Sequence, residues 1–333
     1  MAHSAPLIRS SLLSEFPALV AELGGSIGPV LEETGLTLEQ IEQPTLLIPF
    51  EKQIKLLQVA AGHCQREAFG LELAKRQDIA VFGALSLLAM QCPTIEQGLR
   101  LFGRYLHYSV QAVKLDLWTQ NDLGHLLIDT QYTVARESDQ FWDHSVATAF
   151  SLMSVLCGQG WKPRAVYLRR PEPIDPNYYS QYFRCPVAFG SDASELVFER
   201  GLLQQPISRS IDSVPGQLQT YLRDNFAGDF LEQMRRVIIS LLPTEDCNAK
   251  TVARCMGYSL RSLQRKLAAE QTGFQRQLDG IRSELAINYL QEPQFSLTDI
   301  GALLGFAELS VFSRTFKRWF GVTPSQWRNR RFG

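Results

Sequence analysis

Two passages near the C-terminal end of the chain repeat one local plan: a short helix, a tight turn and a longer amphipathic helix. They span residues 251–273 and 296–321. In each passage a glycine, Gly257 or Gly305, stands where the first helix is expected to end, and glycine turns a chain at little steric cost. The repeat predicts two successive helix–turn–helix motifs.

The second helix of each motif is predicted to bury an apolar side and to expose a polar, basic side. The apolar positions are Leu260, Leu263 and Leu267, and then Val311, Phe312, Phe316 and Trp319. The outward positions are Arg261, Gln264, Arg265 and Lys266, and then Ser310, Ser313, Arg314, Lys317 and Arg318. In the major groove of DNA, Arg pairs with guanine and Gln with adenine, while Lys and Arg at the flanks neutralise phosphates. The pattern therefore predicts double-stranded DNA as a partner.

The segment between the two motifs is expected to hold them at a fixed spacing. Residues 275–290 have the apolar pattern of one helix, which would be a rod about 24 Å long. Two recognition helices held by such a rod can enter successive major-groove faces, about 34 Å apart. Ser296 and Asp299 form a capping-box pattern at the start of the second motif.

Charge is distributed unevenly along the chain, although the net charge is only −1. From Asp246 to the C-terminus, 13 Lys and Arg stand against 7 Asp and Glu, whereas the preceding residues carry 20 against 27. A basic segment on an acidic body indicates a polyanionic partner at one end only. The basic excess coincides with the two motifs, which supports the DNA-binding prediction.

The preceding part of the chain mixes helical and strand patterns. Up to about residue 91 the apolar spacing is mostly helical, with Pro49 at the start of one helix and Thr94 as the expected cap of another. Residues 110–118 and 125–132 have strand character around Asn121 and Asp122, which predicts a hairpin.

Further along, helices are expected over residues 138–156 and 176–183, and short strands over residues 165–168 and 195–198. Because strands and helices do not alternate regularly, this body is predicted to be α+β rather than a doubly wound sheet.

A linker is predicted after the last of these strands. Residues 204–216 contain Pro206, Pro215 and several serines, a composition typical of connections between domains. Helical segments over residues 217–225 and 229–242 belong either to the linker region or to the edge of the last domain. We therefore expect domains over residues 1–205 and 229–333, joined by a linker over residues 206–228.

Several classes of protein are disfavoured by the sequence. It has no apolar run of the roughly 20 residues that a membrane helix needs, and its N-terminal residues lack the pattern of a secretory signal. Its six cysteines form no CxxC pair, and its five histidines form no HExxH pair. We therefore expect a cytoplasmic protein with reduced thiols, no membrane partner, no metal site and no cofactor.

The last domain resembles the DNA-binding domain of the AraC/XylS family of bacterial transcription regulators. The resemblance is carried by VARCMGYSLRSLQRKL, by DIGALLGFAELSVFSRTFKRWFGVTPSQWR and above all by the terminal G-x-T-P-x-x-W-R at residues 321–328. Gly301 departs from it, because the family usually has alanine there. The resemblance implies base contacts from Arg261, Gln264, Arg265, Ser310 and Arg314. Phosphate contacts are expected from Lys250, Lys317, Arg318, Arg328, Arg330 and Arg331.

The body resembles the arabinose-binding-type effector domain of one AraC/XylS subgroup, which includes regulators of ornithine, dehydrocarnitine and fatty-acid metabolism. The matching segments are FGLELAKRQ, VFGALSLLAMQCPTIEQGLRLFGRYL and CPVAFGSDASELVFER, at residues 69–77, 81–106 and 185–200. The implied fold class is an α+β N-terminal effector domain followed by an all-α DNA-binding domain with two helix–turn–helix motifs. The implied function is a transcription regulator, expected to be an activator, with RNA polymerase, a small-molecule effector and a second copy of the chain as partners.

An effector pocket is predicted where a helix leads into a strand. Its candidate residues are Arg104, Tyr105, His107, Tyr108, Trp118 and Trp142. An arginine among aromatic rings can hold a carboxylate while the rings hold an apolar tail, so a fatty acid or another small carboxylate is the hypothesis. The alternative is that the aromatic residues are core and Arg104 faces solvent. The helix over residues 138–156 either supplies a dimer interface or is buried in the body.

Two other functions remain open on the sequence alone. The chain can be a ligand-independent regulator whose body serves only for dimerisation or partner contact. It can also be an enzyme joined to a DNA-binding domain, although the sequence has no nucleophile elbow, phosphate loop or dinucleotide fingerprint. A reactive member of the set Cys64, Cys92, Cys157 and Cys185 is the nearest candidate for such chemistry.

Overall fold

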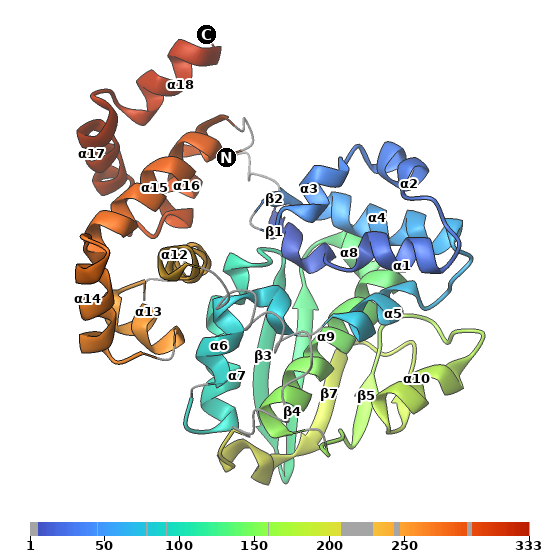
Figure 1. Ribbon diagram of the computed structural model, residues 1–333. Coiled ribbons are helices and arrows are strands. Elements are labelled where there is room, and N and C mark those ends of the chain that lie inside the picture. The colour runs from blue at the N-terminus through green and yellow to red at the C-terminus, as the bar shows by residue number, and fades with distance from the viewer. Residues whose placement is uncertain are drawn as a thin grey trace. The chain divides into compact units, whose positions relative to one another are not determined.

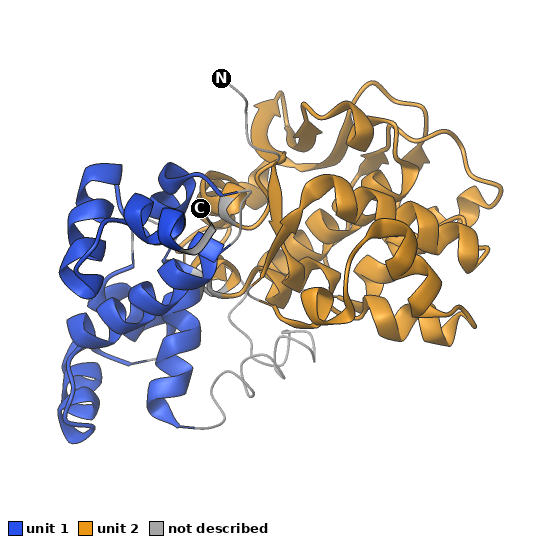
Figure 2. Ribbon diagram, turned by 90° about the horizontal axis from the view of Figure 1, so that it is seen from above, with its two compact units in different colours: residues 1–5, 222–333 blue, residues 6–221 orange. Residues whose placement is uncertain are grey.

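The computed structural model describes residues 6–44, 46–77, 79–90, 92–158, 160–207, 229–242, 247–256, 258–291 and 295–332. The chain divides into two compact units, an N-terminal unit of residues 6–221 and a C-terminal unit of residues 222–333 that also includes residues 1–5 (Figure 2). Most of the expected linker, the expected helix over residues 217–225 and the turn residue Gly257 lie outside the described residues.

The N-terminal unit is built around a five-stranded sheet with strand order β3-β4-β7-β5-β6. Its strands are β3 Val113–Gln120, β4 Leu123–Thr130, β5 Ala165–Tyr167, β6 Val187–Ala188 and β7 Ser194–Glu199. The predicted hairpin is confirmed, because β3 and β4 pair antiparallel with Trp118 opposite His125. Asn121 turns the chain between them with φ at +53°, a conformation that Asn tolerates better than most residues.

The helices of this unit cover the sheet and a small second sheet of β1 Leu7–Arg9 and β2 Leu47–Pro49. They are α1 Phe16–Glu22, α2 Ile27–Thr34, α3 Leu38–Glu42, α4 Phe50–His63, α5 Phe69–Arg76, α6 Ala84–Met90, α7 Ile95–Tyr105, α8 Thr133–Arg136, α9 Asp139–Cys157 and α10 Pro176–Phe183. Thr94 caps α7 as predicted, since its hydroxyl accepts from the Gln97 amide. Pro49 stands one residue before α4, at its N-cap.

Helix α9 is the central element of the N-terminal unit. It contacts β4, β7, α4 and α5 (Figure 1), and Phe141, Val146 and Met153 are almost fully buried. Of the two sequence-based interpretations, the structure therefore supports a buried core helix. Asp143 on α9 accepts hydrogen bonds from Arg170 and Tyr179, both at 2.6 Å. The first is a buried ion pair, and the second ties the helix to α10.

The C-terminal unit is helical in every described residue range. Its helices are α12 Phe230–Leu241, α13 Ala249–Cys255, α14 Leu260–Ala269, α15 Phe274–Gln291, α16 Leu297–Leu303, α17 Leu309–Phe320 and α18 Pro324–Phe332. The two helix–turn–helix pairs are α13–α14 and α16–α17, with α15 between them (Figure 1). The predicted fold class, an α+β domain followed by an all-α domain with two such motifs, is confirmed. No helix among the described residues is long and apolar enough to cross a membrane.

Two apolar positions assigned to the core of the motifs are exposed instead. Val311 has 38% of its surface accessible and Leu260 has 39%, whereas Leu263, Leu267 and Phe312 are buried as expected. Both exposed residues lie in the first turn of their helix.

Candidate nucleic-acid interface and ligand cavity

The first motif presents its polar face on α14. Asn248 caps α13 by accepting from the Thr251 amide at 3.0 Å, and Ser259 caps α14 by accepting from the Ser262 amide at 3.1 Å. These caps satisfy backbone donors that the helix itself leaves unpaired. Because Leu263 and Leu267 are buried, the helix turns Arg261, Gln264 and Arg265 outward, and all three are exposed.

The second motif is held by a turn that only glycine fits. Gly305 has φ at +71°, and a Cβ there would lie 2.2 Å from the backbone oxygen of Leu242 at the end of α12. The predicted capping box is confirmed, with Ser296 and Asp299 exchanging hydrogen bonds of 2.9 and 3.1 Å. The end of α12 therefore packs directly on the turn that positions α17.

Arg282 on α15 is a positioning residue that sequence reasoning missed. Its Nε donates to the Leu304 carbonyl at 2.8 Å and its Nη2 donates to the Gly305 carbonyl at 3.1 Å. Its guanidinium also stacks over Phe306, 4.6 Å from the ring centroid. Burial lowers its pKa, yet an arginine stays charged. The sequence does carry a signal for Arg282, because it lies four residues from both Leu278 and Ala286, which are buried, and is thus a single charge on the apolar face of α15.

On α17 the structure places the two expected base-contact residues on the outer face. Ser310 and Arg314 are exposed, one turn apart, with Val311 beside them. The Ser310 hydroxyl donates to Glu308 at 3.0 Å.

The expected phosphate contacts fall into three groups. Lys250, Lys317, Arg318 and Arg330 are exposed, and Arg318 also forms an ion pair of 3.6 Å with Asp279. Arg328 is only half-exposed; its Nε and Nη2 are buried without a hydrogen-bond partner, and burial lowers its pKa. The Arg331 side chain lies outside the described residues.

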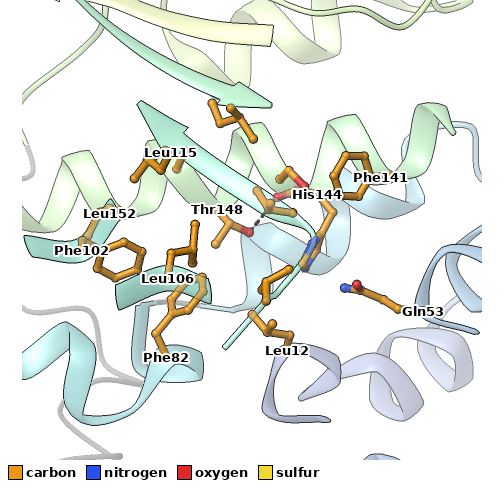
Figure 3. A pocket seen from close by; sticks show the side chains of 15 residues that line it. Leu12, Gln53, Phe82, Phe102, Leu106, Leu115, Phe141, His144, Thr148 and Leu152 are labelled. Carbon is orange, nitrogen blue, oxygen red and sulfur yellow. Dashed lines mark hydrogen bonds between the residues drawn. The ribbon is translucent and has the colours of Figure 1, made fainter. Parts of the chain in front are cut away.

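A cavity of about 60 Å³ lies in the N-terminal unit between α9 and the β3–β4 hairpin. Helix α9 contributes Phe141, His144, Ser145, Thr148, Ala149 and Leu152, which recur at helical spacing. The other lining residues are Leu12, Gln53, Phe82, Phe102, Leu106, Val110, Val113, Leu115 and Ile128. Figure 3 shows Gln53 and His144 at one end of the cavity and Phe82, Phe102 and Leu152 at the other.

The predicted effector residues do not gather around this cavity. Arg104 and His107 are exposed and Tyr105 is half-buried, because Phe102 and Leu106, two residues either side of Arg104, turn the opposite face of the helix inward. Trp118 is 41% exposed and stacks on His125 with centroids 3.8 Å apart. It points to the face of β3 opposite to Val113 and Leu115, since side chains alternate along a strand.

The two remaining candidates are also accounted for. Trp142 is buried beside the cavity-lining Phe141, and its indole nitrogen donates to the Arg136 carbonyl at 3.0 Å. The Tyr108 side chain lies outside the described residues. Of the five candidates whose side chains are described, none is among the lining residues of the cavity.

Within the described ranges, no three His, Cys, Asp or Glu side chains gather as a metal site would require. Burial raises the pKa of Cys157, Cys247 and Cys255 to about 12 and that of Cys185 to about 11. Burial also raises the pKa of Cys64. Since the thiolate is the reactive form, these five thiols are poorly suited to covalent chemistry.

Comparison with known protein families matches both units of the chain. Residues 24–207 match the arabinose-binding domain of AraC transcription regulators, and residues 252–330 match a helix–turn–helix domain. The HTH-type transcriptional regulator VirS of Mycobacterium tuberculosis is 27% identical, over 97% of this chain and 96% of its own length. The ornithine utilization regulator of Pseudomonas aeruginosa is 25% identical, over 93% of each chain.

Among solved structures, the crystal structure of the transcriptional regulator CdpR from Pseudomonas aeruginosa covers 93% of this chain and 98% of its own, with 18% identity and a TM-score of 0.41.

Proposed function

We propose a function from the premise that this chain belongs to the AraC family of transcription regulators. The chain reads a specific operator with α14 and α17, and it responds to a small molecule bound in its N-terminal unit. The base contacts in this proposal are Arg261, Gln264 and Arg265 from α14, and Ser310 and Arg314 from α17. Lys250, Lys317, Arg318 and the three arginines of α18 then contact phosphates.

The observation that carries the proposal is the pair of exposed, basic recognition helices. Each is capped at its N-terminus or held by a constrained turn, and each turns its Arg or Gln side chains outward while its apolar side is buried. Helix α15, 18 residues long and so about 27 Å, separates them. This spacing suits entry into successive major-groove segments on one face of the duplex.

The finer parts of the proposal concern control. The cavity in the N-terminal unit supports an effector-controlled regulator over a ligand-independent one, because a dimerisation domain needs no internal space. We expect activation of transcription through contact with RNA polymerase, and binding as a homodimer that joins two such half-sites and gains avidity. In this proposal the domains extend over residues 1–205 and 229–333, with the linker between them. The protein is proposed to act in the cytoplasm.

An enzyme joined to the DNA-binding domain is the second candidate. No specific observation favours it, because the relatives are regulators and burial raises the pKa of the Cys157 and Cys185 thiols to about 12 and about 11.

The test is selection of an operator from random duplexes by the full-length protein, followed by affinity measurements at several salt concentrations. Arg265→Ala and Arg314→Ala should each lose about 1–3 kcal/mol of discrimination at particular base pairs. Lys75→Ala, which removes one exposed positive charge from α5, is the matched control and should change neither discrimination nor salt dependence. Equal losses on operator and random DNA for both arginine variants would exclude their base-reading role.

A further inference from the structure

The polar end of the cavity contains a buried amide. Gln53 on α4 has 4% of its surface exposed, it lines the cavity, and Figure 3 shows its amide directed into it, toward His144. Its amide atoms are not among the enclosed, unpaired side-chain atoms of the described residues, so an occupant of the cavity can reach them. An amide that faces a cavity forms its hydrogen bonds with whatever occupies the cavity, water or a ligand.

The neighbouring His144 offers an acceptor at the same end. The Gln77 amide nitrogen already donates to the carbonyls of Leu12 and Ser14, at 3.1 and 2.6 Å. Its Oε1, 2.8 Å from His144 Nε2, is therefore an acceptor, and Nε2 must carry the proton. Burial lowers the pKa of His144 to about 4, so the ring is neutral at physiological pH and Nδ1 has a free lone pair.

The rest of the lining is uncharged, and its polar side chains are Ser145 and Thr148. Phe82, Phe102, Leu106, Leu115 and Leu152 surround the other end, and no Lys, Arg, Asp or Glu is among the described residues that line the cavity. An ionised carboxylate placed there would lose its hydration without gaining a cation. The carboxylate hypothesis depended on an arginine, and the one it named, Arg104, lies exposed on the far side of α7.

We propose that this cavity is the effector site and that it takes an uncharged apolar molecule ending in a group that both donates and accepts hydrogen bonds, such as an alcohol. The Gln53 Nε2 donates to the oxygen of that group, and the single hydroxyl proton is donated to His144 Nδ1 or to Gln53 Oε1. The apolar end of the molecule packs against the Phe and Leu side chains. This inference rests on the proposed role of the N-terminal unit as an effector domain.

The test is calorimetric titration of the full-length protein with straight-chain primary alcohols from propanol to hexanol and with the carboxylates of equal chain length. The alcohols should bind, with affinity rising with chain length until the cavity is filled, and each carboxylate should bind at least about tenfold more weakly than its alcohol. This comparison needs only the wild-type protein.

Gln53→Leu tests the amide directly. The apolar variant should be at least as stable as the wild type, because it removes a buried amide, and it should bind each alcohol about tenfold more weakly. Gln58→Leu, at an exposed position of the same helix, is the control and should leave alcohol binding unchanged. In NMR spectra of protein labelled with ¹⁵N-glutamine, the Gln53 side-chain amide signal is the one that is absent from Gln53→Leu. In the wild type this signal should shift on addition of alcohol.

Equal binding of alcohols and carboxylates, or equal alcohol binding by wild type and Gln53→Leu, would overturn the inference. No binding of any alcohol, with Gln53→Leu as stable as the wild type, would mean that water alone occupies the cavity and would also overturn it. Operator binding by the same preparation separates these results from a failure of the proposed function, since DNA recognition does not require the cavity to be filled.

Discussion

Gly301 and Gly305 lie four residues apart in the second motif, yet alanine should have opposite effects at these positions. At Gly305 the backbone is left-handed, with φ at +71°, and an added Cβ would lie 2.2 Å from the Leu242 oxygen. At Gly301, inside α16, an added Cβ would lie 3.6 Å from Phe312 Cβ, which is an ordinary contact. The two substitutions add the same methyl group to the same motif.

The magnitudes follow from this geometry. A left-handed conformation costs a non-glycine residue about 1–2 kcal/mol, and relieving the overlap with Leu242 by shifting the end of α12 costs about 1–3 kcal/mol more. Gly305→Ala should therefore destabilise the motif by about 2–5 kcal/mol. Gly301→Ala should stabilise it by up to about 1 kcal/mol, because alanine favours a helix interior over glycine by that amount.

Hydrogen exchange of the full-length variants, followed by mass spectrometry, measures this locally. Peptides from α16 and α17 should exchange at least about 30-fold faster in Gly305→Ala, which is the factor that corresponds to about 2 kcal/mol, and slower in Gly301→Ala. Peptides from α9 in the N-terminal unit are the internal control and should not change. Wild-type exchange in Gly305→Ala, or faster exchange in Gly301→Ala, would refute the reasoning about the turn.

Three further predictions concern buried polar groups. Arg282→Met should weaken operator binding while leaving random-sequence binding nearly unchanged, because it removes the two hydrogen bonds to the turn before α17; Arg282→Lys should recover part of the loss in the same binding assay. Asp143→Ala should destabilise the N-terminal unit by about 3 kcal/mol in thermal denaturation, because it leaves the buried charge of Arg170 with only its longer ion pair, 3.3 Å, to the exposed Glu67. As pH falls from about 6.5 to about 4, His144 should remove up to about 3 kcal/mol of stability from the unit, because the unfolded chain binds the proton and the folded chain, with a His144 pKa of about 4, does not. Asp143, whose pKa burial raises to about 7, acts in the opposite direction over this range. The His144 contribution is fully present above pH 6.5, and urea denaturation at pH 7 and 4.5 should isolate it as the change in the stability difference between wild type and His144→Gln.

Local patterns were sufficient to predict the C-terminal unit. Caps, apolar spacing and turn glycines are short-range features, and α14, α17 and the capping box at Ser296 lie where they predict. The hairpin and α9 were predicted for the same reason, since each reflects one continuous stretch of sequence. Val311, which is 38% exposed, shows the limit of periodicity, because the burial of a helix position depends on which elements pack against it.

The cavity is different, because only the tertiary structure brings its lining together. Gln53, Phe102, Leu115 and His144 come from α4, α7, β3 and α9, and no pattern in the sequence relates them. The candidates Arg104 and Trp118 were chosen for their chemistry, yet each stands on the far side of an element whose near side lines the cavity. The sequence by itself determined which helices carry basic side chains outward. Only the folded chain decided which uncharged groups face one another, because that choice depends on how separate elements pack rather than on the periodicity within any of them.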